Sequence, residues 1–355
     1  MVKYTVGLAG GLAAAGCPVA LLTRDHDLEF GGEPGAMRKH VEHELGERVT
    51  HERLGGRLRD VGSWGEAARV RRRVGRFGAD VVHLQDSVKN DPRLLAIATA
   101  WRSQPLALTV HDPETRPEEH VPRRETLAYR WLLRRAGLVF VHAEPLREQL
   151  IAAERPTAPI VVVPHGAASG PVTPLPETPM LLVFGRMSPY KGLDVLLDAM
   201  PAVWRSAPAT RLTIAGGGPL PAHAVLSDER VAVRNEHVPE EEVPGLFAAS
   251  TCVVLPYREA SQSGVGSLAK QYGRAVVASA VGGLPELLSD GSGLLVAPES
   301  PPDLAAAVLT LVVDRDRAAA MGRSAAAAVA DRFGWDRVAS LTLDAYRRHL
   351  LTGRG

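Results

Sequence analysis

The stretch Leu182–Leu197, which reads LVFGRMSPYKGLDVLL, shows how this chain is built. An apolar run ends at Gly185, two cations (Arg186 and Lys191) lie on the next turn, and an amphipathic pattern begins after Gly192. An apolar run, a turn and a helix in this order are typical of a parallel α/β sheet, where ligands bind at the carboxyl ends of the strands. The stretch therefore predicts a strand, a cationic turn and a helix beside a binding site.

The same pattern recurs on both sides of this stretch. Apolar runs predict short buried strands, and stretches of helical period separate them. The predicted strands are 81–84, 106–110, 138–141, 160–163, 180–184, 211–215, 231–233, 252–255, 275–278 and 293–296, with helices at 126–135, 146–153 and 336–351. The fold class is α/β, with two doubly wound, Rossmann-like sheets.

Length and composition support two domains. A chain of 355 residues exceeds the size at which a single core usually stops growing, and the proline-rich SGPVTPLPETP at 169–179 has the composition of a linker. We predict an N-terminal domain at 1–168, a C-terminal domain at 180–335, and a final helix at 336–355 that crosses back toward the N-terminal domain.

The N-terminal stretch 4–22 contains no charged residue, so an export signal or a spanning helix is an alternative to a buried element. Glycines at 7, 10, 11 and 16 and Pro18 interrupt it, which favours a helix at 2–15 followed by a strand at 18–23. A helix with no strand before it is an unusual start for an alternating sheet. We hypothesise that a first strand and its glycine-rich turn are missing upstream of Met1.

Composition excludes several classes of function. The net charge of +1 argues against a nucleic-acid partner, and two cysteines allow neither a disulfide framework nor a cysteine metal cluster. We expect a cytoplasmic protein with no transmembrane segment, and we leave peripheral attachment to a membrane open. Asp25-His26-Asp27 imitates a metal-binding D-x-D motif, but no further carboxylates cluster nearby, so we expect no metal.

The cationic turn fits a diphosphate. Arg186 offers a planar fork for phosphate oxygens and Lys191 a compact point charge, although both could simply solvate the turn. A second turn, in YREASQSGVGSLAKQYG at 257–273, places Ser261, Gln262, Ser263 and Gly264 just before a helical pattern. Amide groups at a helix N-terminus bind anions.

Carboxylates stand at two of the turns. Glu259 at the entrance to the second turn is suited to sugar hydroxyl groups, and Glu286 in GGLPELL begins a helix, where it contacts a ribose or merely favours the helix N-terminus. Surface glutamates on loops are the alternative for both. His111, in LALTVHD, stands at a predicted strand end, as do His83 and His165, and a structural histidine is the alternative.

These residues resemble retaining glycosyltransferases of the GT-B fold, in particular glycosyltransferase family 4. The motifs that agree, in order along nearly the whole chain, are VVHLQD, LTVHD, VVPHG, FGRMSPYKG, LTIAGGGP, VVLPYREASQSG, AVVAS and GGLPELLSDGSGLLV. The resemblance implies two domains facing across a cleft, the first on the acceptor side and the second binding the nucleotide sugar.

The resemblance also implies roles for single residues. Arg186 and Lys191 would hold the donor diphosphate, Glu259 and the SQSG amides the donor sugar, and His111 would face that sugar. Gly185, Val265 and Glu286 join the donor site, and backbone near Val238 would hold the base. The implied reaction is transfer of a sugar from a nucleotide-diphosphate sugar to an acceptor hydroxyl, with retention of configuration and without metal or other cofactor, in carbohydrate biosynthesis. The acceptor is a small molecule, a glycan or a lipid-linked molecule.

One departure from the family concerns the ribose. Many members carry a second glutamate eight residues after the first, and here Ser267 stands at that spacing, or Leu268 when counted back from Gly273. Ribose recognition is therefore open, and a degenerate, non-catalytic nucleotide-sugar-binding protein is the alternative function, with a GT-B sugar-nucleotide epimerase behind it. A nicotinamide dehydrogenase is disfavoured because no G-x-G-x-x-G follows a strand.

Overall fold

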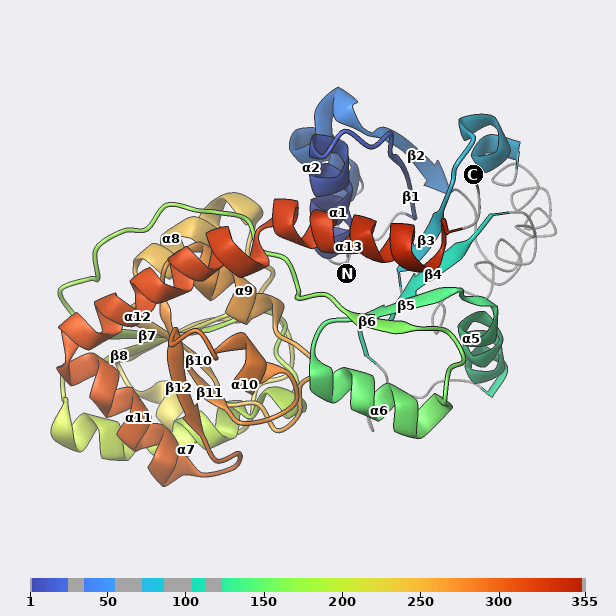
Figure 1. Ribbon diagram of the computed structural model, residues 1–355. Coiled ribbons are helices and arrows are strands. Elements are labelled where there is room, and N and C mark those ends of the chain that lie inside the picture. Colours follow the sequence, from blue (N-terminus) through green and yellow to red (C-terminus); the bar gives the residue numbers. More distant parts are fainter. Residues whose placement is uncertain (1, 25–34, 55–71, 86–103, 113–122, 353–355) are drawn as a thin grey trace. The chain divides into compact units, whose positions relative to one another are not determined.

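The computed structural model describes residues 2–24, 35–54, 72–85, 104–112 and 123–352, which form two compact units (Figure 1). The N-terminal unit contains the described residues up to Pro164 and those from Trp335 onward. The C-terminal unit contains His165–Gly334. Asp25, His26 and Asp27 lie outside the described residues.

The C-terminal unit is built on a six-stranded parallel sheet in the order β12-β11-β10-β7-β8-β9. Every strand predicted from an apolar run in this half is present, and four of the six match to the residue. The strands are β7 (Met180–Phe184), β8 (Arg211–Ala215), β9 (Val231–Arg234), β10 (Cys252–Leu255), β11 (Ala275–Ser279) and β12 (Gly293–Val296).

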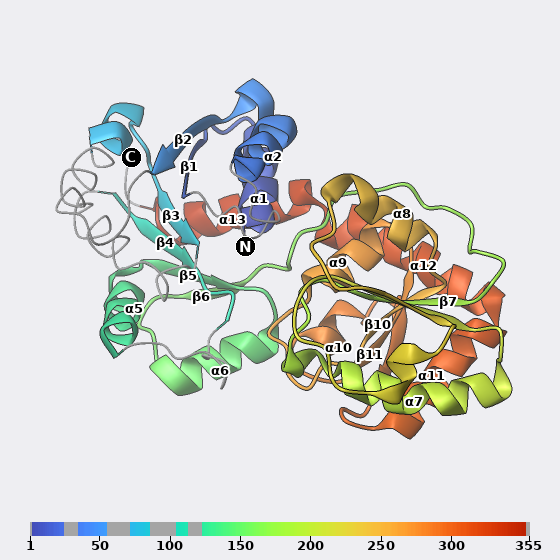
Figure 2. The ribbon, with the colours of Figure 1, turned by 180° about the vertical axis from the view of Figure 1, so that it is seen from behind.

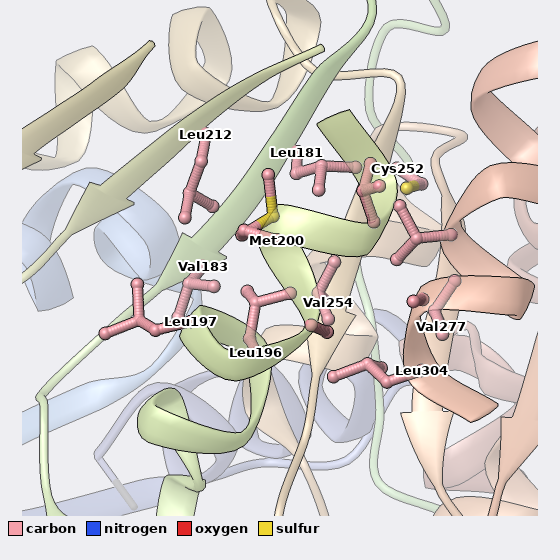
Figure 3. Close-up of a cluster of buried hydrophobic side chains, with 14 of the residues drawn as sticks. Leu181, Val183, Leu196, Leu197, Met200, Leu212, Cys252, Val254, Val277 and Leu304 are labelled. Carbon is pink, nitrogen blue, oxygen red and sulfur yellow. The ribbon is translucent and has the colours of Figure 1, made fainter. Parts of the chain in front are cut away.

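Helices cover both faces of this sheet because alternate strand residues point to opposite sides. Leu181 and Val183 of β7 pack on one face with Leu196 and Met200 of α7 (Figure 3), whereas Leu182 faces the opposite core. The helices of this unit are α7 (Leu193–Ser206), α8 (Val243–Ala248), α9 (Gly264–Gln271), α10 (Leu284–Leu287), α11 (Pro301–Val313) and α12 (Arg315–Ala328).

The N-terminal unit has a four-stranded parallel sheet in the order β3-β4-β5-β6. Its strands are β3 (Val82–Gln85), β4 (Leu106–Thr109), β5 (Leu138–Val141) and β6 (Ile160–Val162). Helices α5 (Arg123–Arg135) and α6 (Glu144–Glu154) share a core with one face, and α1 (Val2–Ala14) and α13 (Trp335–His349) share a core with the other (Figure 2). This sheet is therefore doubly wound as well.

Helix α1 agrees with the helix predicted at 2–15, and it contains three of the glycines that interrupt the apolar stretch. A Cβ atom at Gly7 would lie 2.1 Å from the Trp335 ring, and one at Gly11 would lie 2.4 Å from the Trp335 carbonyl oxygen. These glycines let α13 approach α1 closely instead of ending the helix. The helix ends at Ala14, and Gly16 takes a positive φ of 83° just after it, as the sequence predicted.

In the described N-terminal unit, a strand and an α-helix near the start of the chain were not predicted. A second sheet pairs β1 (Ala20–Arg24) in parallel with β2 (Thr50–Leu54), and α2 (Ala36–Leu45) packs beside them. The β2 sequence, THERL, has no apolar run, and α2 buries a sparse set of apolar side chains (Met37, Val41 and Leu45), so neither pattern stands out. The strand hypothesised upstream of Met1 remains a prediction.

The proline-rich segment 169–179 lies on the C-terminal unit. Arg274, which is buried, donates to the carbonyl oxygen of Thr173 at 2.8 Å, and Arg315 donates to that of Pro176 at 2.7 Å. Two guanidinium groups thus satisfy the backbone of a segment that has no secondary structure of its own.

Candidate functional site

The order of strands in the C-terminal sheet reverses between β7 and β10. Strands β8 and β9 follow β7 on one side, and β11 and β12 follow β10 on the other. Ligands bind at such a switch point, outside the carboxyl ends of the strands. We call the segment Gly185–Gly192 after β7 the cationic turn, and Pro256–Ser263 after β10 the serine turn.

Lys191 is the anchored cation of the cationic turn. It lies on a 3₁₀ turn, η4 (Pro189–Lys191), it is 5% exposed, and its Nζ donates to the Phe184 carbonyl oxygen at 3.0 Å. Gly185 has a φ of 91°, and a Cβ atom there would lie 3.0 Å from this Nζ. Glycine at 185 therefore supplies both the backbone conformation and the space that the ammonium group needs.

Arg186 differs from Lys191 in being exposed. Within the described part of the chain, its guanidinium group forms no hydrogen bond or ion pair. An exposed guanidinium group keeps all its N–H donors available to a phosphate group.

The serine turn leads directly into α9. Ser263 caps that helix, since its Oγ accepts from the Gly266 N–H at 3.1 Å. Ser261 and Gln262 are half-buried before the cap, and Gly264 is the first helical residue. The turn therefore ends at a capped helix N-terminus, where anions are favoured.

Tyr257 and Glu259 flank the entrance to the serine turn. The Tyr257 ring is buried, with Lys191 Nζ 5.8 Å from its centroid, so it links the two turns. Glu259 is exposed and forms no hydrogen bond or ion pair with another described residue. Its carboxylate can therefore accept hydrogen bonds from hydroxyl groups.

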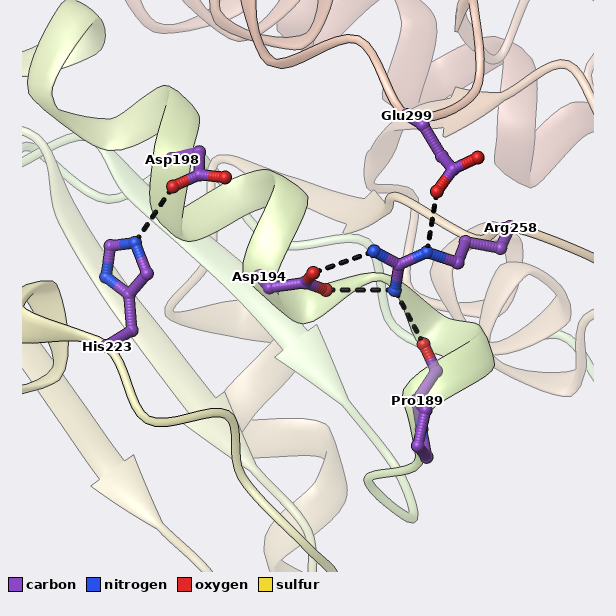
Figure 4. A network of polar contacts seen from close by, with 6 residues as sticks. All are labelled: Pro189, Asp194, Asp198, His223, Arg258 and Glu299. Atoms are coloured by element: carbon purple, nitrogen blue, oxygen red, sulfur yellow. Dashed lines mark hydrogen bonds and ion pairs between the residues drawn. The ribbon is translucent and has the colours of Figure 1, made fainter. Parts of the chain in front are cut away.

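Arg258 ties the two turns together (Figure 4). Its guanidinium group donates to the Pro189 carbonyl oxygen at 2.9 Å and to both Asp194 oxygens at 3.0 and 2.7 Å. It also pairs with Glu299 at 3.0 Å, and its backbone N–H donates to the Tyr190 carbonyl oxygen at 2.8 Å. The hydrogen bonds and charge of Arg258 lower the pKa of Asp194. One side chain thus holds η4, the start of α7 and the serine turn in register.

Glycines bring neighbouring turns into contact. A Cβ atom at Gly192 would lie 2.0 Å from the Pro256 carbonyl oxygen, and one at Gly282 would lie 1.4 Å from that of Ala260. Gly282 has a φ of 51° and precedes α10, whose first turn contains the half-buried Glu286. Glycine at 282 therefore lets the turn before Glu286 pack closely against the serine turn.

The turn after β8 completes the group. The Met187 N–H donates to the Gly217 carbonyl oxygen at 2.9 Å, and Gly218 N–H donates to Asn235 Oδ1 at 2.9 Å. Asn235 follows β9, and Val238, three residues later, is buried in the core below. The structure thus brings together the predicted residues of this half, namely Gly185, Arg186, Lys191, Val238, Glu259, Ser261, Gln262, Ser263, Gly264, Val265 and Glu286, on turns that contact one another or lie on adjacent strands.

Ser267 has a structural partner. It lies inside α9, is 6% exposed, and its Oγ lies 3.3 Å from His165 Nδ1. His165, one of the predicted strand-end histidines, also lies 3.0 Å from the Gly166 carbonyl oxygen through the same nitrogen. Ser267 and His165 are thus linked within the C-terminal unit.

His111 lies in the N-terminal unit, in a row of polar groups at the carboxyl edge of the sheet. From β3 to β6 the row contains Gln85, His111, His142 and the Val163 carbonyl oxygen. His111 Nε2 is 3.2 Å from Gln85 Oε1, His111 Nδ1 is 3.0 Å from His142 Nε2, and His142 Nδ1 is 3.0 Å from Val163 O. One group of the row therefore lies at or just after the end of each strand.

Burial keeps the histidines next to His111 neutral. Burial lowers the pKa of His142 to about 4, and burial, with a contribution from His142, lowers that of His83 to about 3. His83 contacts Thr109 Oγ1 at 2.7 Å and Tyr346 Oη at 2.5 Å, which gives it a structural role within the sheet.

Two residues at the strand ends, Arg258 and His142, were not predicted from the sequence. A signal for His142 was present, because FVHAE repeats the strand-end pattern of TVHDP around His111. Arg258 gave no such signal, since its partners Asp194 and Glu299 are distant in sequence.

The described residues contain neither a candidate metal site nor a candidate membrane span. Among them, no group of three or more His, Cys, Asp or Glu side chains is arranged to hold a metal ion. Within the same part of the chain, no helix combines the length and the apolar character needed to span a bilayer.

Two family profiles match the chain. Residues 1–166 match the glycosyl transferase 4-like domain, and residues 178–314 match glycosyl transferases group 1. Together the two profiles cover most of the chain, and the gap between them, 167–177, overlaps the segment 169–179 that was predicted as a linker.

Curated relatives are also glycosyltransferases. D-inositol 3-phosphate glycosyltransferase of Segniliparus rotundus is 34% identical over 188 residues, which is 50% of this chain and 42% of the relative. A GDP-mannose-dependent phosphatidylinositol monomannoside mannosyltransferase of Mycolicibacterium smegmatis is 30% identical over 59% of this chain and 60% of its own length. These alignments thus span about half of each relative. Glycogen synthase of Mycobacterium tuberculosis is 28% identical over 97% of this chain and 90% of its own.

Solved structures agree on the fold. The Anabaena protein HepE in complex with UDP-glucose superposes with a TM-score of 0.73 at 19% identity, covering 98% of this chain and 95% of its own. Sucrose-phosphate synthase of Thermosynechococcus elongatus superposes with a TM-score of 0.71 at 19% identity, covering 98% of this chain and 92% of its own. The two doubly wound units correspond to the GT-B fold.

Proposed function

Because the chain is a GT-B protein whose halves match glycosyltransferase domains of the family 4 type, we propose that it transfers a sugar from a nucleotide-diphosphate sugar to an acceptor hydroxyl. The anomeric configuration is retained, and no metal ion takes part. The observation that supports this function most directly is the meeting of the cationic turn and the serine turn at the β7/β10 switch point.

The two turns suit a departing diphosphate. Negative charge grows on the diphosphate as the bond to the sugar breaks, so fixed cations and amide groups stabilise the transition state more than the ground state. Lys191 is already held in place by the Phe184 carbonyl oxygen, so its positive charge is fixed on the cationic turn before the ligand arrives. Arg186 closes on the diphosphate from the exposed side, and Gly185 leaves room for both.

The remaining donor contacts follow from the same turns. Glu259 and the amide groups from Ser261 to Val265 bind the sugar, and Glu286 binds the ribose. Backbone at Val238 holds the base. With no protein carboxylate assigned as general base, the leaving phosphate accepts the proton of the acceptor hydroxyl, as the family resemblance implies.

The acceptor belongs to one of the classes that the names of the relatives indicate. These are an inositol phosphate, a phosphatidylinositol mannoside and a glucan. A lipid-linked acceptor would bring the protein to a membrane surface without a spanning helix.

Thermal stabilisation by a panel of UDP, GDP, dTDP and ADP sugars tests donor binding. A donor at 100 times its dissociation constant adds about 2.7 kcal/mol, which shifts a melting curve by a few degrees. We expect one nucleotide class to shift the wild-type curve. Arg186→Ala should lose the shift, while Arg205→Ala, which removes another exposed arginine of the same unit, should keep it.

Turnover tests the chemistry. Replacing Lys191 or Arg186 by Ala should lower the rate about 100-fold to 1,000-fold, the cost of losing one oxyanion donor. The product's anomeric proton coupling by NMR reports retention, and activity should survive EDTA. Donor binding without turnover on any acceptor class would instead favour a non-catalytic nucleotide-sugar-binding protein, and inversion would exclude the retaining mechanism.

A further inference from the structure

The polar row of the N-terminal unit fixes where its protons lie. At one end, the Val163 carbonyl oxygen can only accept a hydrogen bond, and it lies 3.0 Å from His142 Nδ1. His142 Nδ1 must therefore carry a hydrogen.

The other nitrogen of His142 must be an acceptor. The ring is 5% exposed, and burial lowers its pKa to about 4, although the Val163 hydrogen bond and the charge of Asp112 act in the opposite direction. At neutral pH the ring thus has one N–H, which is on Nδ1, and a lone pair on Nε2. His111 Nδ1, 3.0 Å from that lone pair, must be the donor.

We propose that His142 is a positioning residue that fixes the hydrogen of His111 on Nδ1, so that His111 makes every variable contact through Nε2. This assignment does not depend on how the Gln85 amide is turned. With its oxygen toward His111 Nε2, 3.2 Å away, the His111 ring carries a second hydrogen; with its nitrogen there, the ring is neutral and Nε2 accepts. In both arrangements the Nδ1 hydrogen points to His142.

Packing prevents either ring from turning over. Tyr4 of α1 lies edge-on to both rings, with centroids 5.1 Å from His111 and 4.7 Å from His142. Both rings are also buried, with exposed fractions of 6% and 5%. The tautomer that the Val163 carbonyl oxygen selects in His142 is thereby passed on to His111.

The consequence for catalysis rests on the proposed function and on the contact with the donor sugar that the family resemblance implies for His111. If His111 contacts the donor sugar, it does so through Nε2, and the neutral ring accepts a hydrogen bond from a sugar hydroxyl there in place of Gln85. Without His142, the His111 hydrogen is free to move to Nε2, where it would donate to the hydroxyl oxygen, so the hydrogen bond reverses and the hydroxyl hydrogen loses its acceptor.

Nitrogen-15 NMR of histidine-labelled protein at neutral pH tests the assignment directly, without any substrate. We expect wild-type His142 and His111 both to show a protonated Nδ1. In His142→Phe, which keeps an aromatic ring against Tyr4 but offers no acceptor, His111 should shift toward the Nε2-protonated form. In His142→Gln, whose carbonyl oxygen can accept the same hydrogen, the Nδ1 form should persist.

Kinetics supply the second readout. With the donor identified above, His142→Phe should lower kcat/KM about three- to tenfold, the value of one neutral hydrogen bond, and His142→Gln should recover most of it. His51→Phe, in β2 of the same unit, should leave both the His111 signal and turnover unchanged.

The positioning role of His142 and the proposed function can be refuted separately. An Nε2-protonated His111 in the wild type, or an unchanged Nδ1 form in His142→Phe, would overturn the positioning role whatever the enzyme's activity. If His142→Phe does not fold, the wild-type and His142→Gln spectra test the positioning role, because both should show His111 protonated on Nδ1. Correct NMR signals in a protein that turns over no donor would instead refute only the proposed function.

Discussion

The strand ends of the two units present opposite chemistry on similar doubly wound sheets. In the C-terminal unit the turns carry formal charges, some exposed like Arg186 and Glu259, and some held in ion pairs like Arg258. In the N-terminal unit the edge carries a row of polar groups without formal charge at His142, and burial lowers the pKa of His142 and of the nearby His83. Under the proposed function, the turns of the C-terminal unit would provide charge for a diphosphate, and the N-terminal row would provide directed hydrogen bonds.

Acid should affect the N-terminal unit most. His142 and His83 have folded pKa values near 4 and 3, below the unfolded value of about 6.5, so the unfolded chain binds protons first as the pH falls. Their stabilising effect is complete above pH 6.5 and is lost progressively down to pH 4. Protonation of the two rings should together lower the free energy of unfolding by on the order of 5 kcal/mol over this window, because each ring contributes up to about 1.4 kcal/mol per pH unit.

Chemical denaturation between pH 7 and 4 measures this loss. His142→Gln should flatten the pH dependence by about one histidine's share, whereas the exposed His43→Gln in α2 should not. An unchanged slope in His142→Gln would mean that the ring is not held neutral.

Substitution of Gly282 should damage the C-terminal unit next. Alanine there combines a φ of 51° with a Cβ atom 1.4 Å from the Ala260 carbonyl oxygen, so the Glu286 turn must move away from the serine turn. We expect a loss of about 2 to 5 kcal/mol in the free energy of unfolding, from backbone strain and overpacking together.

Gly291→Ala is the matched control for Gly282→Ala. Gly291 has a similar positive φ of 76°, but its Cβ would meet nothing within 4 Å, so only the strain of about 1 to 2 kcal/mol should appear. Equal losses in the two variants would show that the contact between turns contributes nothing.

A smaller effect is expected where α1 crosses α13. Gly7→Ala drives a methyl group to within 2.1 Å of the Trp335 ring and should cost about 1 to 3 kcal/mol. Gly10→Ala in the same helix meets only Leu45 at 3.2 Å, and its better helix propensity should offset that contact. Thermal unfolding of both variants would compare them, and equal melting temperatures would contradict the close crossing.

The smallest change in stability should follow Arg258→Ala. Its ion pairs with Asp194 and Glu299 are partly exposed, so their loss should lower the free energy of unfolding by less than about 1 kcal/mol. Donor binding should nevertheless weaken, because the two turns lose their common anchor. Titration of the donor into Arg258→Ala and into Arg130→Ala, which breaks a surface pair in the N-terminal unit, separates positioning from a general loss of charge.

Most of the sheet framework could be predicted from local sequence. Buried parallel strands such as β7 and β10 are short, continuous apolar runs bounded by turn residues, and their limits were predicted to the residue. Strand β2 could not be predicted in this way, because its polar sequence is a strand only through its pairing with β1. The close approach of α13 to α1 at Gly7 and Gly11 could not be predicted for a related reason, since Trp335 lies at the other end of the chain.

The sequence by itself determined which chemical groups stand at the strand ends, because each turn follows directly from a strand that local hydrophobicity defines. Only the tertiary structure decided how those groups are held. The hydrogen bond from Lys191 to the Phe184 carbonyl oxygen depends on the conformation of the turn. Arg258 is held by residues far along the chain. The position of the hydrogen on His111 depends, through His142, on the Val163 carbonyl oxygen after another strand. Hydrogen bonds and ion pairs form between groups a few ångströms apart in space, and the number of residues between two groups along the chain does not determine that distance.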